Sequence, residues 1–236
     1  MSFSKSAQFY DAIYSWKDYA SEAAKLHALI EQYKRSPGIS LLDVACGTGA
    51  HIPFLREHYA IEGLDLSEEM LVVARQRYPG ITFHQGDMTD FELGRRFDVV
   101  LCLFSSIGYA QSVAQLEQAL AVMSRHTLPG GVVIVEPWLT PEQWQPGTTH
   151  ALFVDQPDLK LARMNVSGLE GRFAIMDMHH LVATAAGVEH FVEQHRMLLF
   201  TQEEYLAAFR AAGLEVTYDA EGLMGRGLYL GKQPLA

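Results

Sequence analysis

Residues 41–50 constrain this sequence more than any other stretch, because they join an apolar run to a turn with two glycines. The run at 41–44 is typical of a short buried strand, and the residues after Gly49 of the start of a helix. At Gly47 and Gly49 the backbone can approach a ligand closely, since glycine has no Cβ. Asp65 ends the next apolar run, where a carboxylate can bind both hydroxyls of a ribose. This pattern predicts a nucleoside cofactor.

The spacing of the glycines indicates which nucleoside. The dinucleotide fingerprint requires G-x-G-x-x-G, which places a pyrophosphate at a helix N-terminus. Here the pattern is Asp43-x-Ala45-x-Gly47-x-Gly49. It resembles the glycine loop of the class I S-adenosylmethionine (SAM) methyltransferases, whose ligand carries no phosphate.

A further acid supports this interpretation. Gly86-Asp87-Met88 follows the apolar run at 81–84, and Asp87 resembles the residue that accepts a hydrogen bond from the adenine amine in that family. The alternative is that the two glycines only make a turn and that the three acids are helix caps or solvated loop residues.

Composition narrows the class of protein. The chain has 236 residues, 49% of them hydrophobic, which predicts one large domain with room for an inserted subdomain. No apolar run reaches the ~20 residues that span a bilayer, and no signal peptide is evident. We therefore expect a cytoplasmic protein with Cys46 and Cys102 reduced. The net charge of −10 argues against a nucleic-acid partner.

Alternating strand and helix patterns predict an α/β fold, Rossmann-like, with helices on both faces of a mostly parallel sheet. A helix is expected over 6–35, with a break at Ser15-Trp16. The expected strands of the parallel part are 40–45, 60–65, 81–84, 97–103 and 131–136, the last entered through the breaker Pro129-Gly130-Gly131. The expected helices between them are 50–58, 67–77 and 112–127.

Residues 137–200 differ from the rest of the chain. After a proline-rich loop, the apolar residues recur with period two around 173–181 and 191–199, which predicts an antiparallel patch. We expect it to lie above the crevice outside the carboxyl ends of the parallel strands, where ligands bind in such sheets. A capped helix over 201–211 and two closing strands would complete a seven-stranded sheet. We therefore divide the chain into a SAM-binding core, 1–136 with 201–236, and an inserted β subdomain, 137–200.

Several further motifs point to a narrower family. They are Phe9-Tyr10-Asp11, Lys17-Asp18-Tyr19-Ala20, Phe104-Ser105-Ser106-Ile107-Gly108-Tyr109, Val135-Glu136-Pro137-Trp138 and Gly225-Arg226-Gly227-Leu228. With the glycine loop and Gly86-Asp87-Met88, they resemble the nucleotide-sugar N,N-dimethyltransferases that make dimethylated amino sugars such as desosamine and mycaminose. The resemblance covers nearly the whole chain.

The resemblance implies a set of site residues. Those implied for SAM, with the glycine-loop residues, are Tyr10, Asp43, Ala45, Gly47, Gly49, Asp65, Leu66, Met70, Asp87, Met88 and Leu103. Those implied for a dTDP-linked amino sugar are Tyr19, Glu136, Trp138, Arg163, His195 and Arg226. Tyr109 and His179 are the candidates for catalysis, with Glu136 and His195 as further groups that could orient the amine.

The chain also departs from the family pattern. Between Tyr14 and Lys17 it has only Ser15-Trp16, where the family has a longer stretch, and an early family aromatic is matched at best by Phe3. Three interpretations stay open: an amino-sugar N-methyltransferase, a methyltransferase with another small-molecule acceptor, and a non-catalytic SAM-binding protein. No metal is expected, because neither His179 nor His195 pairs with a cysteine or carboxylate at a recognised metal-ligand spacing. A homodimer is our expectation for the assembly.

Overall fold

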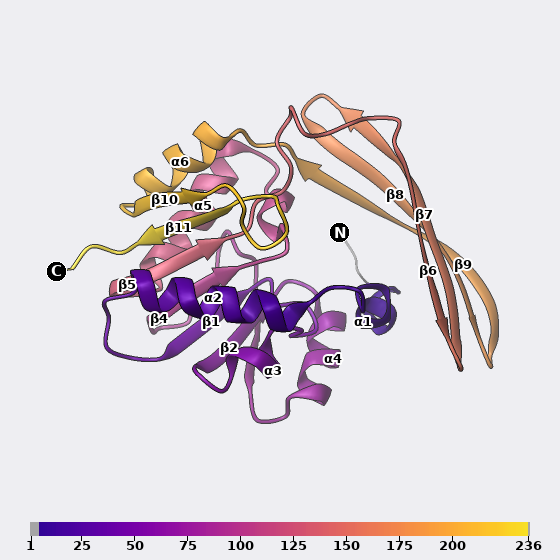
Figure 1. Cartoon of the computed structure of the whole chain (residues 1–236), viewed down its shortest axis with the longest axis horizontal. Coiled ribbons are helices and arrows are strands. Elements are labelled where there is room, and N and C mark those ends of the chain that lie inside the picture. Colours follow the sequence, from indigo (N-terminus) through magenta and orange to yellow (C-terminus); the bar gives the residue numbers. More distant parts are fainter. Residues whose placement is uncertain (1–4, 236) are drawn as a thin grey trace.

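The computed structural model describes residues 5–235 and contains two β-sheets (Figure 1). Phe3 lies outside the described residues. The larger sheet has seven strands in the order β10-β11-β5-β4-β1-β2-β3. Its strands are β1 Ser40–Val44, β2 Ala60–Asp65, β3 Thr82–Gln85, β4 Phe97–Cys102, β5 Thr127–Val135, β10 Glu215–Asp219 and β11 Leu228–Lys232. Strands β1 to β5 are parallel and β11 is antiparallel to both its neighbours, which confirms the predicted class.

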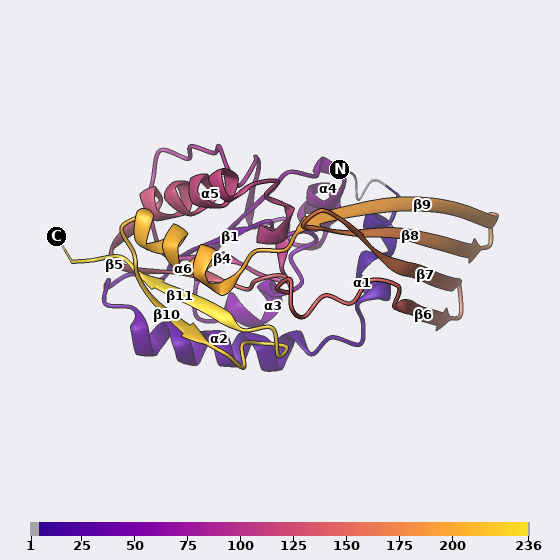
Figure 2. The same ribbon diagram turned by 90° about the horizontal axis from the view of Figure 1, so that it is seen from above.

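Helices cover both faces of this sheet, and Figure 2 shows α2 and α5 on opposite sides of it. The longer helices are α2 Tyr19–Tyr33, α4 Glu68–Arg77, α5 Val113–Arg125 and α6 Gln202–Ala211. One buried cluster joins α2 and α4 to one sheet face, and another joins α5 and α6 to the opposite face. Two helix starts were correctly predicted: Ser67 accepts a hydrogen bond from the Met70 N–H, and Thr201 forms a capping box with Glu204.

Two predicted helices are shorter than expected. The region 6–35 divides into a 3-10 turn η1 Ala7–Phe9, a single turn α1 Tyr10–Ile13 and then α2, so the predicted break is wider than Ser15-Trp16. The helix predicted over 50–58 is only α3 Ile52–Leu55. No side chain caps the N-terminus of α3, so this short helix lacks one source of stabilisation that α4 and α6 have.

The fifth strand begins earlier than predicted. Pro129-Gly130-Gly131 lies inside β5 instead of before it, and the pairing with β4 shifts between Phe97 and Val99. A Cβ at Gly131 would lie 2.7 Å from the Asp98 carbonyl oxygen, so only glycine allows the two strands to approach here. The residues that resemble a breaker therefore form a bulge within the strand.

The second sheet has four antiparallel strands, of which the sequence predicted only the last two. They are β6 Thr149–Gln156, β7 Leu159–Glu170, β8 Phe173–Thr184 and β9 Gly187–Leu198. The sheet extends away from the helix-covered core (Figures 1 and 2). Its inner face packs on α1 through Ile13, Val154 and Phe191. The larger sheet's β5 ends at Val135, and the second sheet runs from Thr149 to Leu198.

No helix among residues 5–235 is long and apolar enough to cross a membrane. Within the same residues, no group of three or more histidine, cysteine, aspartate or glutamate side chains could hold a metal ion. Cys46 and Cys102 are free thiols.

Candidate functional site

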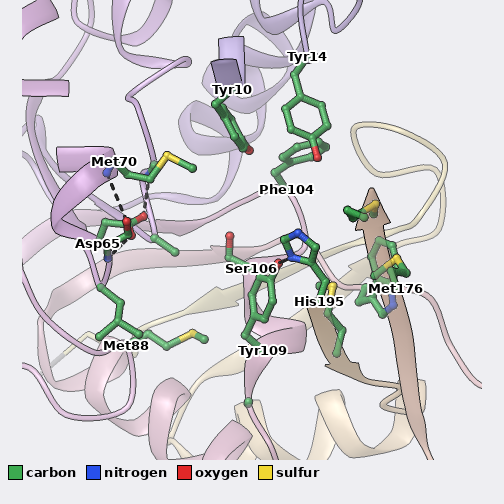
Figure 3. Close-up of a pocket in the computed structure, with 18 of the residues that line it drawn as sticks. Tyr10, Tyr14, Asp65, Met70, Met88, Phe104, Ser106, Tyr109, Met176 and His195 are labelled. Atoms are coloured by element: carbon green, nitrogen blue, oxygen red, sulfur yellow. Dashed lines mark hydrogen bonds between the residues drawn. The ribbon is translucent and has the colours of Figure 1, made fainter. Parts of the chain in front are cut away.

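A single cavity of about 870 Å³ runs from the carboxyl ends of β1, β2 and β4 to the inner face of the second sheet. In Figure 3, Asp65, Met70 and Met88 lie at one end and Met176 at the other, with Tyr109 and His195 between them. The first end belongs to the α/β core and the second to residues 137–200. The cavity therefore has room for two ligands placed end to end.

The glycine loop forms the floor of the first end. Ala45 has φ 58° and Gly47 φ 55°, so the chain turns through left-handed conformations directly after β1. The Gly47 N–H donates to Asp65 Oδ2 at 2.7 Å, and the Ser67 N–H donates to Asp65 Oδ1 at 2.8 Å. Asp65 therefore ties the glycine loop to the start of α4. Burial raises the pKa of Asp65, an effect opposed by the N–H groups of Ser67, Gly47 and Leu66.

This end has the shape and chemistry that SAM requires. The carboxylate of Asp65 lies where a ribose can be bound, and Asp87 stands one strand further along, after β3. The Met70 and Met88 side chains also line the cavity and offer apolar surface to an adenine ring. The residues present therefore fit the cofactor.

Aromatic side chains form the wall that joins the two ends. The rings of Tyr10 and Tyr14 are 4.6 Å apart, and Phe104 meets Tyr14 edge-on at 5.0 Å. Arg163, from β7, donates to the Tyr14 hydroxyl at 3.0 Å. The segment that carries the tyrosines is held to the core by Asp11, which accepts a hydrogen bond from the Thr48 hydroxyl at 2.8 Å and pairs with Arg77.

Tyr109 and His195 meet in the middle of the cavity. The Tyr109 hydroxyl lies 2.6 Å from His195 Nδ1. Burial lowers the pKa of His195 to about 4 and raises the pKa of Tyr109, so both side chains are uncharged at neutral pH. An imidazole with so low a pKa is a weak base. The pair is suited to orienting a polar group rather than to taking a proton from it.

Arg226 reaches the same cavity from the loop between β10 and β11. Its guanidinium lies 4.9 Å from the centre of the Trp138 ring and donates to Ser105 Oγ at 3.0 Å. Lys25 of α2 holds this loop by donating to the Gly222 carbonyl at 2.6 Å and by pairing with Asp219. A cation is therefore fixed beside the cavity by contacts from three separate parts of the chain.

Comparison with known proteins places this geometry in a family. A family model described as "Methyltransferase domain" matches residues 41–131. A dTDP-3-amino-3,6-dideoxy-alpha-D-glucopyranose N,N-dimethyltransferase of Streptomyces fradiae is 45% identical over 229 residues, covering 95% of this chain and 89% of the relative. A dTDP-3-amino-3,4,6-trideoxy-alpha-D-glucopyranose N,N-dimethyltransferase of Streptomyces venezuelae is 46% identical, covering 95% and 96%. The chain belongs to the dTDP-amino-sugar N,N-dimethyltransferase family.

Solved structures agree with this assignment. DesVI of Streptomyces venezuelae has a TM-score of 0.91 at 45% identity and covers 97% of this chain and 98% of its own. SAM-bound CalS10, an amino pentose methyltransferase from Micromonospora echinaspora, has a TM-score of 0.85 at 38% identity, with coverage of 99% and 98%. The protein is thus a SAM-dependent methyltransferase, as the glycine loop predicted.

The methyltransferase brings most of the predicted site residues together. Those that line the cavity are Tyr10, Ala45, Gly47, Asp65, Leu66, Met70, Asp87, Met88, Tyr109, Trp138, Arg163, His195 and Arg226. Those that do not are Asp43, Gly49, Leu103, Tyr19, Glu136 and His179.

The six residues outside the cavity lie beneath it or away from it. Asp43 and Leu103 are buried under the strand ends, and Gly49 packs against Ile52 and Tyr78. Tyr19 makes an edge-to-face contact with the buried His51, with ring centres 4.9 Å apart.

His179 was a candidate for catalysis, and the structure places it on the outer face of the second sheet. It is exposed there and stacks on His190. On β8 the even-numbered neighbours Met176 and Met178 face the cavity instead. Because side chains alternate along a strand, His179 points away from them.

The sequence analysis missed a row of polar residues on β7. Arg163 was predicted, but Asn165 and Ser167, two and four positions later, line the cavity beside it. His150 on the adjacent β6 lies 3.2 Å from the Ser167 hydroxyl. Counting every second residue from Arg163 along a strand would have found Asn165 and Ser167. The position of His150 in the cavity follows from the pairing of β6 with β7, which the sequence does not show.

Asp65→Asn is expected to weaken SAM binding by ~10-fold or more. The carboxylate now accepts hydrogen bonds from two backbone N–H groups, and in the variant one of these donors would face the amide NH₂, which cannot accept. Isothermal titration calorimetry with SAM measures the change. Glu62→Gln alters another acid of β2, outside the cavity, and serves as the control that should bind normally. Equal weakening in both variants would contradict this account of Asp65.

Asp43 predicts a pH dependence of stability. Burial, with a smaller contribution from Asp65, raises the pKa of Asp43 to about 7, whereas an unfolded Asp titrates at about 4. Between these values the folded chain keeps a proton that the unfolded chain has lost, so raising the pH destabilises the fold through this group. Asp43→Asn does not titrate. The Tm of the variant minus that of the wild type, measured without cofactor, should rise from pH 5 to pH 8; a constant difference would contradict the assignment.

Proposed function

We propose that this methyltransferase N,N-dimethylates the amine of a dTDP-linked amino sugar. The observation that carries the proposal is the continuous cavity, which joins the cofactor end to the second sheet with Tyr109 and His195 at the junction. Relatives at 45% and 46% identity are named for 3-amino sugars, and one at 39% for a 4-amino sugar. A 3-amino sugar is accordingly the first acceptor to test.

In this proposal residues 137–200 act as the subdomain that covers the substrate. They contribute Arg163, His150 and Asn165 to the cavity, and Arg226 adds a second cation from the core. The chain as a whole has a net charge of −10, so these arginines would supply the local positive charge that a diphosphate requires. Trp138 and Trp144, with ring centres 5.9 Å apart, offer apolar surface to a base or sugar.

The chemistry then depends mainly on positioning. Bound SAM supplies a methyl group activated by its sulfonium. The protein holds the neutral amine in line with that methyl, so that the N–C bond forms as the C–S bond breaks and the amine proton leaves to water. Tyr109 and His195 orient the amine through their shared hydrogen bond.

Two free cysteines are compatible with function in the cytoplasm, which we include in the proposal.

Mass spectrometry of reactions with SAM and a panel of dTDP-3-amino and dTDP-4-amino sugars tests the proposal. We expect a gain of two methyl groups, with S-adenosylhomocysteine formed, and faster turnover of the 3-amino sugars. SAM binding without transfer to any member of the panel would contradict the proposed acceptor and point to another small molecule.

Tyr109→Phe tests the positioning mechanism. Loss of one hydroxyl is expected to lower kcat by ~3- to 10-fold with KM for SAM unchanged, because a neutral amine is already a good nucleophile. His179→Ala, on the outer face, should leave kcat unchanged. Abolished activity in a folded Tyr109→Phe protein would mean that the hydroxyl takes part in proton transfer and that positioning alone is an incorrect account.

We also propose that the protein is a homodimer assembled through the outer face of the second sheet. That face exposes large apolar side chains, namely Phe153 (71% exposed), Met164, Val166, Leu181 and Val192. The strand pairing places them in adjacent rows across all four strands. Several large exposed apolar side chains on one face are typical of an interface, and the same face on a second copy is the natural complement.

Phe153→Asp combined with Leu181→Asp is expected to convert the dimer to a monomer, since each subunit would bury two unpaired charges. Size-exclusion chromatography with light scattering measures the mass. Phe54→Asp changes an exposed aromatic on α3 and should leave the assembly unchanged. A wild-type monomer, or a dimer that survives the double substitution, would contradict this interface.

A further inference from the structure

The turn after β4 is strained. Phe104 has φ 50° and Ser105 φ 64°, so two adjacent non-glycine residues are left-handed. Such conformations cost free energy and persist only where their surroundings enforce them. The turn leads directly into η2 Ser106–Tyr109, which brings Ser106 and Tyr109 to the cavity (Figure 3). Its conformation therefore determines where Tyr109 lies.

Glu136 holds this turn from below. It follows β5 directly, and its own N–H donates to the Cys102 carbonyl at 2.9 Å, which places it beside the end of β4. Its Oε2 accepts a hydrogen bond from the Phe104 N–H at 2.7 Å. The side chain is fully buried and does not line the cavity. Within residues 5–235, its Oε1 has no hydrogen-bond partner.

Other contacts hold the same turn. Ser105 Oγ donates to the Pro137 carbonyl at 2.7 Å and accepts from Arg226. The buried Lys17 ammonium, paired with Glu22, lies 4.8 Å from the centre of the Phe104 ring. Glu136 differs from the Ser105, Arg226 and Lys17 side chains because its carboxylate binds a backbone group of the turn, the Phe104 N–H. Its burial also argues against the direct substrate contact that the sequence suggested.

We propose that Glu136 is a positioning residue, which keeps the Phe104–Ser105 turn left-handed through the Phe104 N–H and so sets where Tyr109 meets the methyl-accepting amine. The part of this inference that concerns the amine rests on the proposed function. The hold on the turn does not, because it is a property of the unliganded chain.

Two variants separate the hydrogen bond from the charge. Glu136→Gln loses the charge but keeps an oxygen that can accept from Phe104. Glu136→Asp keeps the charge but is one methylene too short to reach the N–H. We expect amide hydrogen exchange in the peptide that contains Phe104 to be near wild type in the Gln variant and ~10-fold faster or more in the Asp variant.

Activity should follow the same order. The Gln variant should retain kcat within ~3-fold, and the Asp variant should lose ~10-fold or more with KM for SAM unchanged, because only the placement of Tyr109 is disturbed. The reverse order, with Gln inactive and Asp active, would show that the charge of Glu136 acts in the reaction and would overturn the proposal. Normal exchange in both variants would also overturn it.

A control distinguishes positioning from general loss of stability. Asp98 is another buried carboxylate that accepts backbone N–H groups, from Gly38 and Ser40 at 3.0 Å each, at the opposite end of the strands. Asp98→Asn should lower Tm but leave kcat and exchange at Phe104 unchanged, and a fall in kcat equal to that of Glu136→Asp would overturn the proposal. If the wild type methylates no amino sugar, the proposed function fails, and the exchange measurement still decides the role of Glu136.

Discussion

The hydrogen bond from the Gly47 N–H to Asp65 joins the two features on which the cofactor end of the site depends. It exists because β1 and β2 are adjacent and parallel, so that their carboxyl ends emerge at one edge of the sheet. The same carboxylate accepts from Ser67 at the start of α4. One half-buried side chain thus fixes the glycine loop and the following helix relative to each other, and any ligand placed there meets preformed contacts.

At the carboxyl end of β4, nearer the proposed acceptor, side chains likewise fix the conformation of a turn. There the chain enters a strained turn, and Glu136 and Arg226, from the end of β5 and the loop before β11, both bind it. The second sheet then closes the cavity with one face and leaves several large apolar side chains exposed on the other. The family fold in this way supplies the methyl-transfer chemistry, while residues 137–200 line the part of the cavity in which we propose that the acceptor binds.

Much of the site was predictable from the sequence, because local patterns of residues mark the strand ends where its side chains lie. The glycine loop, Asp65, Asp87 and Tyr109 all lie at or shortly after strand ends, and the strand pattern located those ends correctly. The errors have physical causes. Pro129-Gly130-Gly131 resembles a chain breaker but forms a bulge within β5, and β6 and β7 carry too many polar residues on their cavity face to show a clear apolar alternation.

The sequence by itself determined the α/β class, the cofactor and the family, since these depend on residue types at short spacings within single strand–turn units. Only the tertiary structure decided which long-range neighbours meet. His179 is exposed and His195 lines the cavity, because strand pairing directs alternate side chains to opposite faces. Likewise, Glu136 binds the Phe104 turn and does not line the cavity, because β4 and β5 are adjacent in the sheet although the two residues are far apart in the chain.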